Sequence, residues 1–393
     1  MKAVVVGGGI GGITAAVALA RKGVEVTVLE QAPVIAPVGA SLQLGPNAVR
    51  LMKDIGLLDA LRSVGSRPDA VELLRWQDGA VLHHAEHGAA AEAHFGASQL
   101  DFFRPDLHRA LVESLPAGAL RLGARVVGVG ETPNGAEAVV ESGERFSADL
   151  VVAADGIRSP MRQALVGAED PVFSGTVVYR AMIPFERAAD LHPDFVNRYW
   201  LGHARHGVSY RVGKGELLAL NLGVQRAEPS QESWTLEADP DEALGYLEGW
   251  DEAFLERIRR ADTVLRGAVY VRKSLEHWSY GPITLLGDAA HAMEPFQAQG
   301  AAQAVEDAYV LAECVGAAPD DVSGALSRYE DIRMGRALEL QRSSSGAGSE
   351  LYLPDGLEQQ ARDARYASGA EELRWGIRQS VWEYDLRDAL LAG

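Results

Sequence analysis

The sequence predicts an α/β fold in which a domain with a parallel sheet is interrupted by an inserted antiparallel sheet and followed by C-terminal helices. Three observations predict this fold. The chain opens with a strand, a glycine turn, a helix and a second strand; two later segments again end an apolar strand in a turn of small residues; and a long middle span alternates like strands joined by hairpins. We expect the parallel sheet in residues 1–70, 100–170 and 281–345, the inserted sheet in 71–99 and 171–280, and helices in 346–393.

Composition excludes several classes of protein. Hydrophobic residues make up 47% of the chain, too many for a disordered or fibrous protein. The net charge of −18 would repel a phosphate backbone and an anionic membrane surface, so we expect neither nucleic acid nor membrane as a partner. The single cysteine, Cys314, forbids an internal disulfide and fits a reducing compartment. We therefore expect a cytoplasmic protein, active as a monomer or homodimer.

The first element is a dinucleotide-binding βαβ unit. "KAVVV" predicts a strand, "GGGIGG" a turn, Ile13 to Lys22 a helix and "VEVTVLE" a second strand. Gly7, Gly9 and Gly12 supply G-x-G-x-x-G, whose small residues let the backbone approach a pyrophosphate at the helix N-terminus. Glu30 ends the second strand, where a carboxylate can accept hydrogen bonds from a ribose. The pattern alone does not choose between NAD and FAD.

Two further segments extend this sheet. "DFFRPDLHRALVESL" predicts a helix with Pro105 in its first turn and Arg104 at its start. "SADLVVAADGIRSPMRQAL" repeats the order of apolar strand, turn and helix, with Asp155 at the turn. These segments and the region near 281–315 must come together in space to form one domain.

The stretch "LLGDAAHAMEPFQAQGAAQAVEDA" predicts a strand that ends in a carboxylate, Asp288, followed by a loop and a long helix that begins at Gly300. The first N–H groups of that helix, at Ala301 and Ala302, have no partner within the helix and carry partial positive charge. Such a corner can hold a polyhydroxylated, partly anionic ligand.

The middle of the chain predicts hairpins. "AVELLRWQDGAVLHHAE" and the span from Val172 to Tyr280 alternate in polarity, and Asp78-Gly79 and Gly213-Lys214-Gly215 are typical of the connecting turns. We expect this antiparallel sheet to form the substrate domain.

The three motifs, taken in order, resemble a single-component, FAD-dependent aromatic hydroxylase of the flavoprotein monooxygenase class. They are G-x-G-x-x-G with Glu30, the "ADGIRS" turn and the "GDAAHAMEPFQAQGAAQAVEDA" corner. "GASLQLGPNAVRLM", "RYWLGHARHGVSYRV" and "YDLR" are most similar to salicylate hydroxylases and 6-hydroxynicotinate 3-monooxygenases. The resemblance implies a Rossmann-like FAD-binding domain and NADH or NADPH as a transient co-substrate, since no second complete glycine motif exists to hold a nicotinamide.

The resemblance also implies roles for individual residues. Asp288 would contact the ribityl hydroxyls of FAD, and the N–H groups after Gly300 would stabilise negative charge on the reduced ring. Arg104 would contact the cofactor, and Val126, in "LGARVVGV", would contact the adenine through its backbone. Asp155 would serve both FAD and the passing NAD(P)H.

The chemistry that the resemblance implies is a hydroxylation. NAD(P)H reduces FAD, O₂ adds to give a C4a-hydroperoxyflavin, and a small phenolic or carboxylated aromatic ring takes the distal oxygen. An FAD-dependent epoxidase, or another oxygenase that acts on a non-aromatic natural product, remains open because pocket shape and not motif distinguishes it. A flavin halogenase would carry W-x-W-x-I-P, which this sequence lacks.

Four residues are candidates for substrate chemistry. Gln43 lies in the loop that approaches the flavin in the family; a histidine there is typical of hydroxynicotinate hydroxylases, so Gln43 favours the salicylate-like pattern. Pro295 would let its loop lie flat against the isoalloxazine. His206 and Tyr210 share one face of a strand by the two-residue period and would relay a proton and bind a phenol if that face meets the flavin.

The opposite face of the same strand carries Ser209 and Arg211, and Arg211 would favour a carboxylate if that face lined the site. Tyr179 and Arg180 lie on a neighbouring strand and are candidates to line the same site.

Four histidines cluster in "HHAEHGAAAEAH", at positions 83, 84, 87 and 94. Their spacing is irregular and no cysteine lies nearby, so the pattern lacks the regularity of a zinc site. We expect solvent-exposed histidines on a hairpin and loop, and no metal.

Overall fold

The computed structural model describes residues 1–36, 39–228 and 236–392. In these ranges the first large sheet has six strands in the order β18-β19-β11-β1-β2-β7 and is parallel except for the pair β18–β19. Its strands are β1 (Lys2–Val6), β2 (Glu25–Leu29), β7 (Leu120–Arg121), β11 (Leu150–Ala153), β18 (Ser279–Tyr280) and β19 (Ile283–Leu285).

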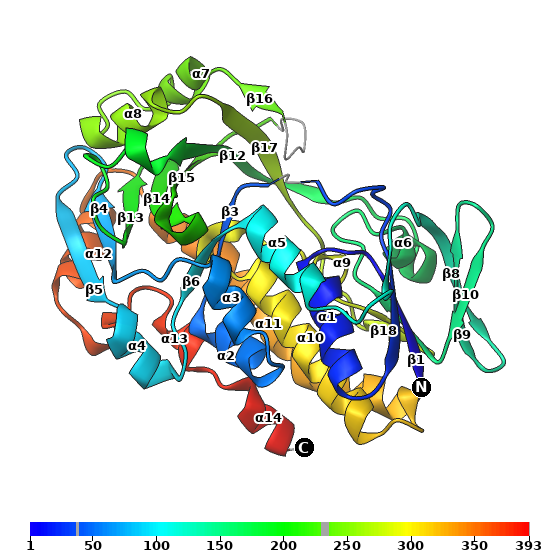
Figure 1. Ribbon diagram of the computed structural model, residues 1–393. Helices are drawn as coiled ribbons and strands as arrows, with labels where there is room; N and C mark the ends of the chain where they lie inside the picture. Colours follow the sequence, from blue (N-terminus) through cyan, green and yellow to red (C-terminus); the bar gives the residue numbers. More distant parts are fainter. Residues whose placement is uncertain (37–38, 229–235, 393) are drawn as a thin grey trace.

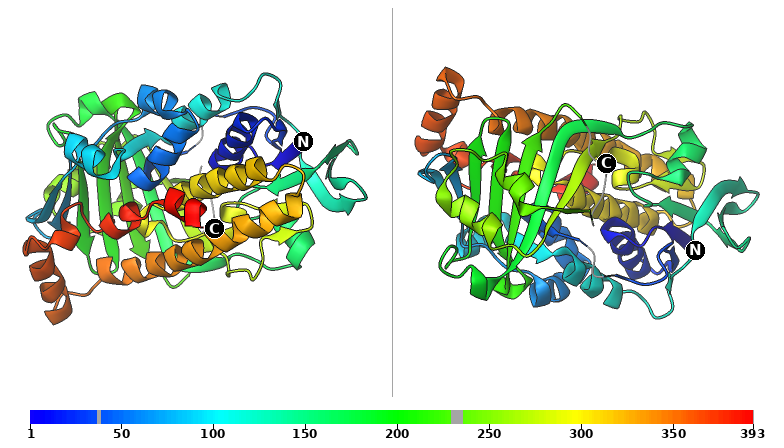
Figure 2. Two further views of the ribbon diagram at one scale, coloured as in Figure 1. Left: turned by 90° about the horizontal axis from the view of Figure 1, so that it is seen from below. Right: turned by 90° about the horizontal axis from the view of Figure 1, so that it is seen from above.

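Helices and a small sheet complete this part of the molecule. Helix α1 (Ile10–Arg21) packs against α10 (Gly300–Ala317), and α10 packs against the long helix α11 (Val322–Leu351). Figure 2 shows α10 and α11 side by side along the length of the molecule. The sheet of β8 (Val126–Thr132), β9 (Gly135–Val140) and β10 (Arg145–Ala148) contacts β11 and β1.

The second large sheet has eight strands in the order β16-β17-β12-β15-β14-β13-β4-β5. They are β4 (Ala70–Arg75), β5 (Val81–Glu86), β12 (Val172–Pro184), β13 (Val196–Gly202), β14 (Arg205–Val212), β15 (Leu217–Gln225), β16 (Glu237–Ala238) and β17 (Val264–Val271). The predicted hairpin turns join β4 to β5 and β14 to β15, with positive φ at Gly79, Gly213 and Gly215. The sheet is antiparallel except for β13–β4, which is parallel.

The two faces of this sheet have different surroundings. One face packs against α7 (Pro240–Leu244) and α8 (Glu252–Arg259) around Trp200, Phe254 and Ile258. The other, here called the inner face, carries Val208 and Tyr210. It meets a two-stranded sheet of β3 (Ser41–Leu44) and β6 (Leu100–Phe103), which leads into α2 (Pro46–Asp54) and α5 (Arg104–Glu113).

The C-terminal segment folds back over the edge of the eight-stranded sheet. It contains α12 (Leu357–Ala367), α13 (Gln379–Glu383) and α14 (Leu386–Ala392), and α12 contacts β5. Other helices are α3 (Leu58–Val64), α4 (Gly88–Phe95), α6 (Pro160–Val166) and α9 (Asp288–His291). No helix in the described ranges is long and apolar enough to cross a membrane.

The prediction of solvent-exposed histidines is wrong for two of the four. His83 is buried with its ring nitrogens 3.0 and 2.8 Å from the carbonyl oxygens of Tyr366 and Leu373. His87 is buried against the carbonyl of Trp375. The cause is the C-terminal segment, which covers this edge of the sheet and leaves His84 and His94 outside. No group of three metal-binding side chains lies together in the part of the chain that the structure describes.

Candidate cofactor and substrate site

The three sequence motifs meet at one edge of the six-stranded sheet. Strands β1, β11 and β19 are neighbours, with Val6 opposite Ala153 and Ala153 opposite Leu285. The glycine turn (Gly7–Gly12), the DG turn (Asp155–Gly156) and the GD turn (Gly287–Asp288) therefore leave the carboxyl ends of adjacent parallel strands. Ligands of open α/β sheets bind at this edge.

The glycine turn has the shape of a dinucleotide cradle. Gly7 has φ +104°, and a Cβ there would lie 2.4 Å from the Ala154 carbonyl oxygen. A Cβ at Gly12 would lie 2.0 Å from the Gly7 carbonyl oxygen, whereas a Cβ at Gly9 would meet no atom within 4 Å. Gly7 and Gly12 are thus required by the close packing of the turn, and Gly9 leaves open space at the start of α1. That space fits a pyrophosphate.

Glu30 is held beside the glycine turn. Its Oε2 accepts a hydrogen bond from the Gly8 N–H and its Oε1 accepts one from the Ala32 N–H, each at 2.7 Å. The Gly8 carbonyl lies 2.5 Å from His108 Nε2. The carboxylate is therefore fixed in place next to the cradle, where it can also accept a hydrogen bond from a ribose hydroxyl.

Arg104 and Asp288 come from distant segments to the same side of the sheet. Asp288 is exposed and begins α9 directly after Gly287, whose φ of +63° favours glycine. Arg104 begins α5, and its backbone N–H donates to the Ala40 carbonyl at 2.9 Å. Burial lowers the pKa of Arg104, while the nearby charge of Asp288 opposes this shift. The guanidinium and the carboxylate thus lie within electrostatic reach of each other.

Asp155 is half-buried in the DG turn, and its Oδ2 accepts a hydrogen bond from the Met161 N–H at 3.2 Å. Burial raises the pKa of this carboxyl group. Val126 is buried at the first position of β8.

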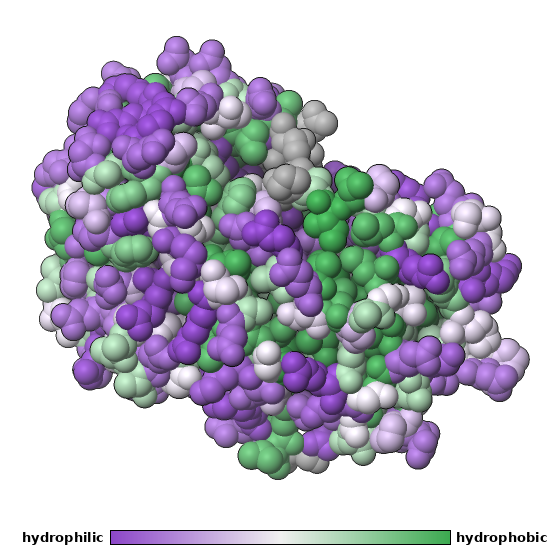
Figure 3. All heavy atoms as spheres, in the orientation of Figure 1, coloured by the Kyte–Doolittle hydropathy of each residue, from purple (hydrophilic) through white to green (hydrophobic). Residues whose placement is uncertain are grey.

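Figure 3 shows hydrophobic residues gathered on the surface over α1 and the strands beside it, whereas the surface over α7 and α8 is hydrophilic.

The loop that follows the GD turn leads into α10. Pro295 is exposed and begins a short 3₁₀ turn, Pro295–Gln297. The chain then reverses at Ala298, whose φ is +52°, before α10 begins at Gly300. Gly300 and Ala301 are half-buried and Ala302 is buried. The N–H groups of this first turn have no acceptor within the helix, so they are available to an anionic group.

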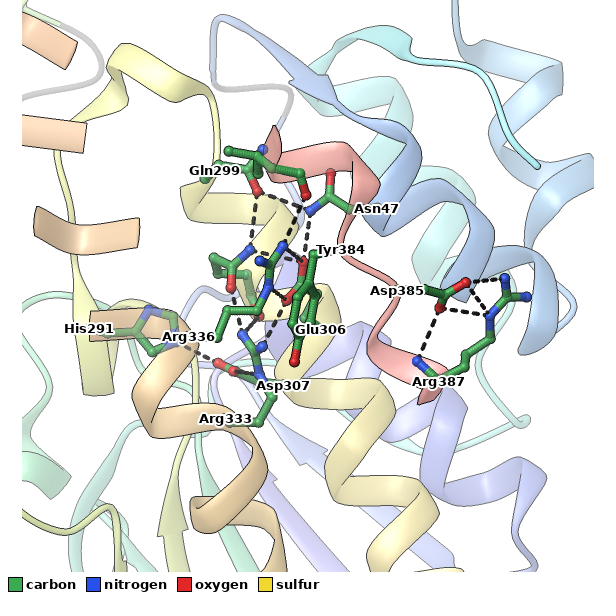
Figure 4. Close-up of polar contacts among 12 residues, drawn as sticks. Asn47, His291, Gln299, Glu306, Asp307, Arg333, Arg336, Tyr384, Asp385 and Arg387 are labelled. Atoms are coloured by element: carbon green, nitrogen blue, oxygen red, sulfur yellow. Dashed lines mark hydrogen bonds and ion pairs between the residues drawn. The ribbon is translucent and has the colours of Figure 1, made fainter. Parts of the chain in front are cut away.

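A buried ion-pair cluster, made of Glu306, Asp307, Arg333 and Arg336, holds α10 against α11 (Figure 4). Arg333 Nη1 donates to Glu306 at 2.7 Å and Arg333 Nε donates to Asp307 at 2.8 Å. Arg336 Nε donates to Glu306 at 2.8 Å. The carboxylates and Arg333 are almost completely buried, so each charge depends on its partners.

The ion-pair cluster also reaches the cofactor edge. Asp307 Oδ2 accepts hydrogen bonds from the Gly287 N–H at 2.9 Å and from His291 Nε2 at 2.6 Å. Burial alone would raise the pKa of Asp307, but the charges of His291 and Arg333 lower it to about 2. Glu306 accepts a hydrogen bond from Asn47 of α2 at 2.7 Å. The position of the GD turn is therefore tied to α2, α10 and α11 together.

The inner face of the eight-stranded sheet carries His206 and Tyr210. Tyr210 donates its hydroxyl proton to Ser41 Oγ at 2.7 Å, and the His206 ring lies 5.7 Å from the ring of Phe296. Phe296 directly follows Pro295, so this face lies against the loop after the GD turn. Burial raises the pKa of Tyr210 and lowers that of His206 to about 4.

Arg211 and Tyr179 point to the opposite face. The Arg211 guanidinium stacks on the rings of Phe185 and Phe195, and Tyr179 donates to Glu242 at 2.7 Å. Arg180, one residue along β12, shares the inner face instead, because it lies opposite Asn221 and Asn221 lies opposite Val208. Burial lowers the pKa of Arg180 to about 10, so the side chain is a cation at neutral pH.

Gln43 takes part in a buried hydrogen-bond group that the sequence did not predict. Its Oε1 accepts from the Tyr199 hydroxyl at 2.8 Å and from Arg378 Nη1 at 2.9 Å, and Arg378 Nη2 donates to the Tyr199 hydroxyl at 3.0 Å. Tyr199 lies opposite Val208 on the neighbouring strand. Applying the two-residue period to that strand as well would therefore predict that Tyr199 lies on the inner face. Arg378 comes from the C-terminal segment, 335 residues from Gln43, and no local pattern marks it.

Comparison with known proteins identifies the family of the chain. The family model described as FAD binding domain matches residues 1–344. The chain is 41% identical to 3-amino-4-hydroxybenzoate 2-monooxygenase of Streptomyces platensis, over 91% of this chain and 90% of the relative. It is 35% identical to 6-hydroxynicotinate 3-monooxygenase of Bordetella bronchiseptica, over 86% and 89%. The structure of a salicylate hydroxylase substrate complex superposes with a TM-score of 0.84 at 29% identity, covering 100% of this chain and 98% of that one.

The fold and the edge where the three turns meet define a dinucleotide-binding flavoprotein. The chain belongs to the FAD-binding-domain family and is an FAD-dependent monooxygenase of the aromatic hydroxylase class. The expected fold class, cofactor and enzyme class are thereby confirmed.

We expect substitution by alanine to have different effects at Gly12 and at Gly9. Gly12→Ala forces a Cβ into the Gly7 carbonyl and should lower the free energy of unfolding of the cofactor-free protein by about 1–3 kcal/mol. Gly9→Ala should leave that free energy within about 0.5 kcal/mol of the parent and weaken FAD binding instead. Urea unfolding and FAD titration measure the two effects. Equal destabilisation by both changes would contradict the described geometry.

Removal of one charge from the ion-pair cluster should be costly. Arg333→Leu leaves Glu306 and Asp307 buried with too few partners, so we expect the free energy of unfolding to fall by about 3–5 kcal/mol. Arg342→Leu, at an exposed position of the same helix, is the control and should change it by less than about 0.5 kcal/mol. Urea unfolding of both variants measures these changes. A similar loss of unfolding free energy in the two variants would show that burial of the ion pairs of Arg333 does not contribute.

Proposed function

We propose that the protein hydroxylates a small aromatic ring that carries a carboxylate and an electron-donating hydroxyl or amino group. The observation that carries this proposal is Arg180, a half-buried cation on the inner face whose electrostatic environment includes Tyr210. The relatives agree in chemistry, since their names specify aminohydroxybenzoate, hydroxynicotinate and salicylate, each a ring with a carboxylate.

FAD would lie along the carboxyl edge of the six-stranded sheet. The open space at Gly9 would take its pyrophosphate, Glu30 its ribose, and Asp288 with Arg104 its middle portion. Val126 and Asp155 border the same edge and would contact the adenine and the passing NAD(P)H. When bound, FAD supplies the chemistry that accepts electrons from NADH or NADPH and delivers one oxygen atom of O₂ to the substrate.

The loop from Pro295 to Ala302 would stabilise the reduced cofactor. Pro295 presents a side chain without hydrogen-bonding groups, which leaves the surface of the loop free of competing donors. The unpaired N–H groups at the start of α10, from Gly300 to Ala302, would lower the energy of negative charge nearby.

The inner face would bind and orient the substrate. A guanidinium binds a carboxylate through two parallel hydrogen bonds, so Arg180 would fix one end of the ring. Because burial raises its pKa, Tyr210 stays protonated, and with its own proton donated to Ser41 it would accept a hydrogen bond from the ring hydroxyl. Gln43 would support this pocket through Tyr199. Tyr210 and Gln43 are buried, and such surroundings would keep water away from a ring bound beside them.

The Arg180 guanidinium also bears on the alternative of an epoxidase with a non-aromatic, neutral substrate. Such a substrate would offer no anionic group to the guanidinium, whereas a ring carboxylate would gain a charge-assisted hydrogen bond from it. The inner face therefore favours a carboxylated aromatic ring as the substrate.

The proposal is tested by NAD(P)H oxidation with the FAD-loaded protein, with hydrogen peroxide measured in parallel. We expect hydroxybenzoates, aminohydroxybenzoates or hydroxypyridine carboxylates to stimulate oxidation with little peroxide, and matched phenols without the carboxylate to stimulate it weakly. If no aromatic compound stimulates oxidation, or if the uncarboxylated phenols are as good, the proposal is wrong.

Arg180→Leu should act on carboxylated substrates selectively. Loss of a charge-assisted hydrogen-bonded pair costs about 2 kcal/mol, so kcat/KM for the carboxylated ring should fall roughly thirtyfold while kcat/KM for the matching phenol changes little. Arg211→Leu is the control, because Arg211 lies on the opposite face against Phe185 and Phe195. Steady-state kinetics with both substrates measure this; an equal loss on both would assign Arg180 a structural role.

A further inference from the structure

Tyr352, at the end of α11, reaches the inner face of the eight-stranded sheet. Its hydroxyl lies 2.9 Å from Nδ1 of His206, and its ring packs edge-on against Phe296 with 5.3 Å between centroids. The residue is 5% exposed and lies beyond residue 344, where the match to the family model ends. No sequence motif marks it.

The direction of this hydrogen bond follows from the protonation of both groups. Burial raises the pKa of Tyr352, so the phenol keeps its proton at neutral pH. Burial lowers the pKa of His206 to about 4, so the imidazole is neutral. A neutral imidazole has one N–H donor and one bare acceptor nitrogen. Within the described part of the chain, Nδ1 of His206 is the hydrogen-bond partner of the Tyr352 hydroxyl, so the buried phenol proton is directed to it and Nδ1 is the acceptor.

The other ring nitrogen, Nε2, therefore carries the hydrogen. It makes no hydrogen bond within the described part of the chain, and His206 is only half-buried. Gly223 lets the ring lie close to β15, because a Cβ there would fall 2.2 Å from His206 Cε1. The ring is thus held from one edge by Tyr352 and Gly223, and its Nε2–H remains for a ligand at the inner face.

We propose that Tyr352 is a positioning residue that fixes His206 as the Nε2–H tautomer, so that His206 donates a hydrogen bond to an oxygen of the bound substrate and does not relay a proton. This inference rests on the proposed function, in which the inner face, where His206 lies, binds the substrate. It replaces the expectation from the sequence that His206 is a proton relay. It also assigns the C-terminal segment a part in orienting the substrate.

The tautomer is measured directly by NMR of protein labelled with ¹⁵N at its 10 histidines. His206→Gln identifies the His206 signals. We expect His206 in the parent protein to show a protonated Nε2 and a bare Nδ1, and Tyr352→Phe to shift it to a mixture of tautomers or to Nδ1–H. A parent protein with Nδ1–H, or a Tyr352→Phe variant with the parent pattern, would overturn the inference. The experiment does not require turnover.

Kinetics test whether the tautomer matters. Tyr352→Phe should lower kcat/KM for the aromatic carboxylate about tenfold, the effect of one hydrogen bond of ordinary strength, and should increase the fraction of NAD(P)H consumed as peroxide. Tyr366→Phe is the matched control: it removes a hydroxyl from the same buried aromatic cluster, but that hydroxyl donates to Glu350 at 2.9 Å. We expect the control to retain the parent kinetics and the parent histidine spectrum.

The outcomes separate this inference from the proposed function. If the parent protein hydroxylates no aromatic carboxylate, the proposed function fails, and the role of His206 as a donor to the substrate fails with it, whatever the tautomer. If the parent is active and Tyr352→Phe changes the tautomer without changing kcat/KM or coupling, the proposed function stands and the positioning role of Tyr352 is wrong. Equal losses in Tyr352→Phe and Tyr366→Phe would assign both hydroxyls to stability alone.

Discussion

Two adjacent buried carboxylates, Glu306 and Asp307, are the constraint on which the site depends. Neighbouring residues of a helix point in different directions, so one helix turn of α10 reaches two places: Glu306 meets α2 through Asn47, and Asp307 meets the GD turn through the Gly287 N–H. Arg333 neutralises both from α11. Buried charges tolerate little displacement, because a separated pair leaves an uncompensated charge in an apolar interior. The start of α10, the loop at Pro295 and the exposed Asp288 therefore keep fixed positions relative to one another.

The eight-stranded sheet is organised by a second constraint, the two-residue period of its strands. It divides the eight-stranded sheet into a face that packs on α7 and α8 and an inner face that carries polar groups. The side chains of Arg180 and Tyr179, which are adjacent in sequence, therefore lie on opposite faces: Arg180 is on the inner face and Tyr179 is in the packed core. The C-terminal segment then completes the inner face with Tyr352 and Arg378. The proposed site thus draws residues from both sheets and from a part of the chain distant from either.

Much of the fold could be predicted from the sequence, and the reasons are local. The glycine turn, the DG turn and the GD turn each couple an apolar strand to a small-residue turn, and such patterns are read within about 20 residues of chain. The two-residue period of the strand predicted that His206 and Tyr210 share one face and that Arg211 lies on the other. No local sequence pattern indicated which of the two faces points inward. The burial of His83 and His87, and the contact of Arg378 with Gln43, depend on how the C-terminal segment returns across the sheet. Such long-range packing leaves no periodic trace in the sequence.

The most direct test of this account is a structure of the protein with FAD and an aromatic carboxylate bound. The account predicts the carboxylate against Arg180, a ring oxygen within hydrogen-bond distance of His206 Nε2 or the Tyr210 hydroxyl, and the cofactor along the edge formed by the glycine, DG and GD turns. A ring bound with its carboxylate at Arg211, or away from the inner face altogether, would contradict it.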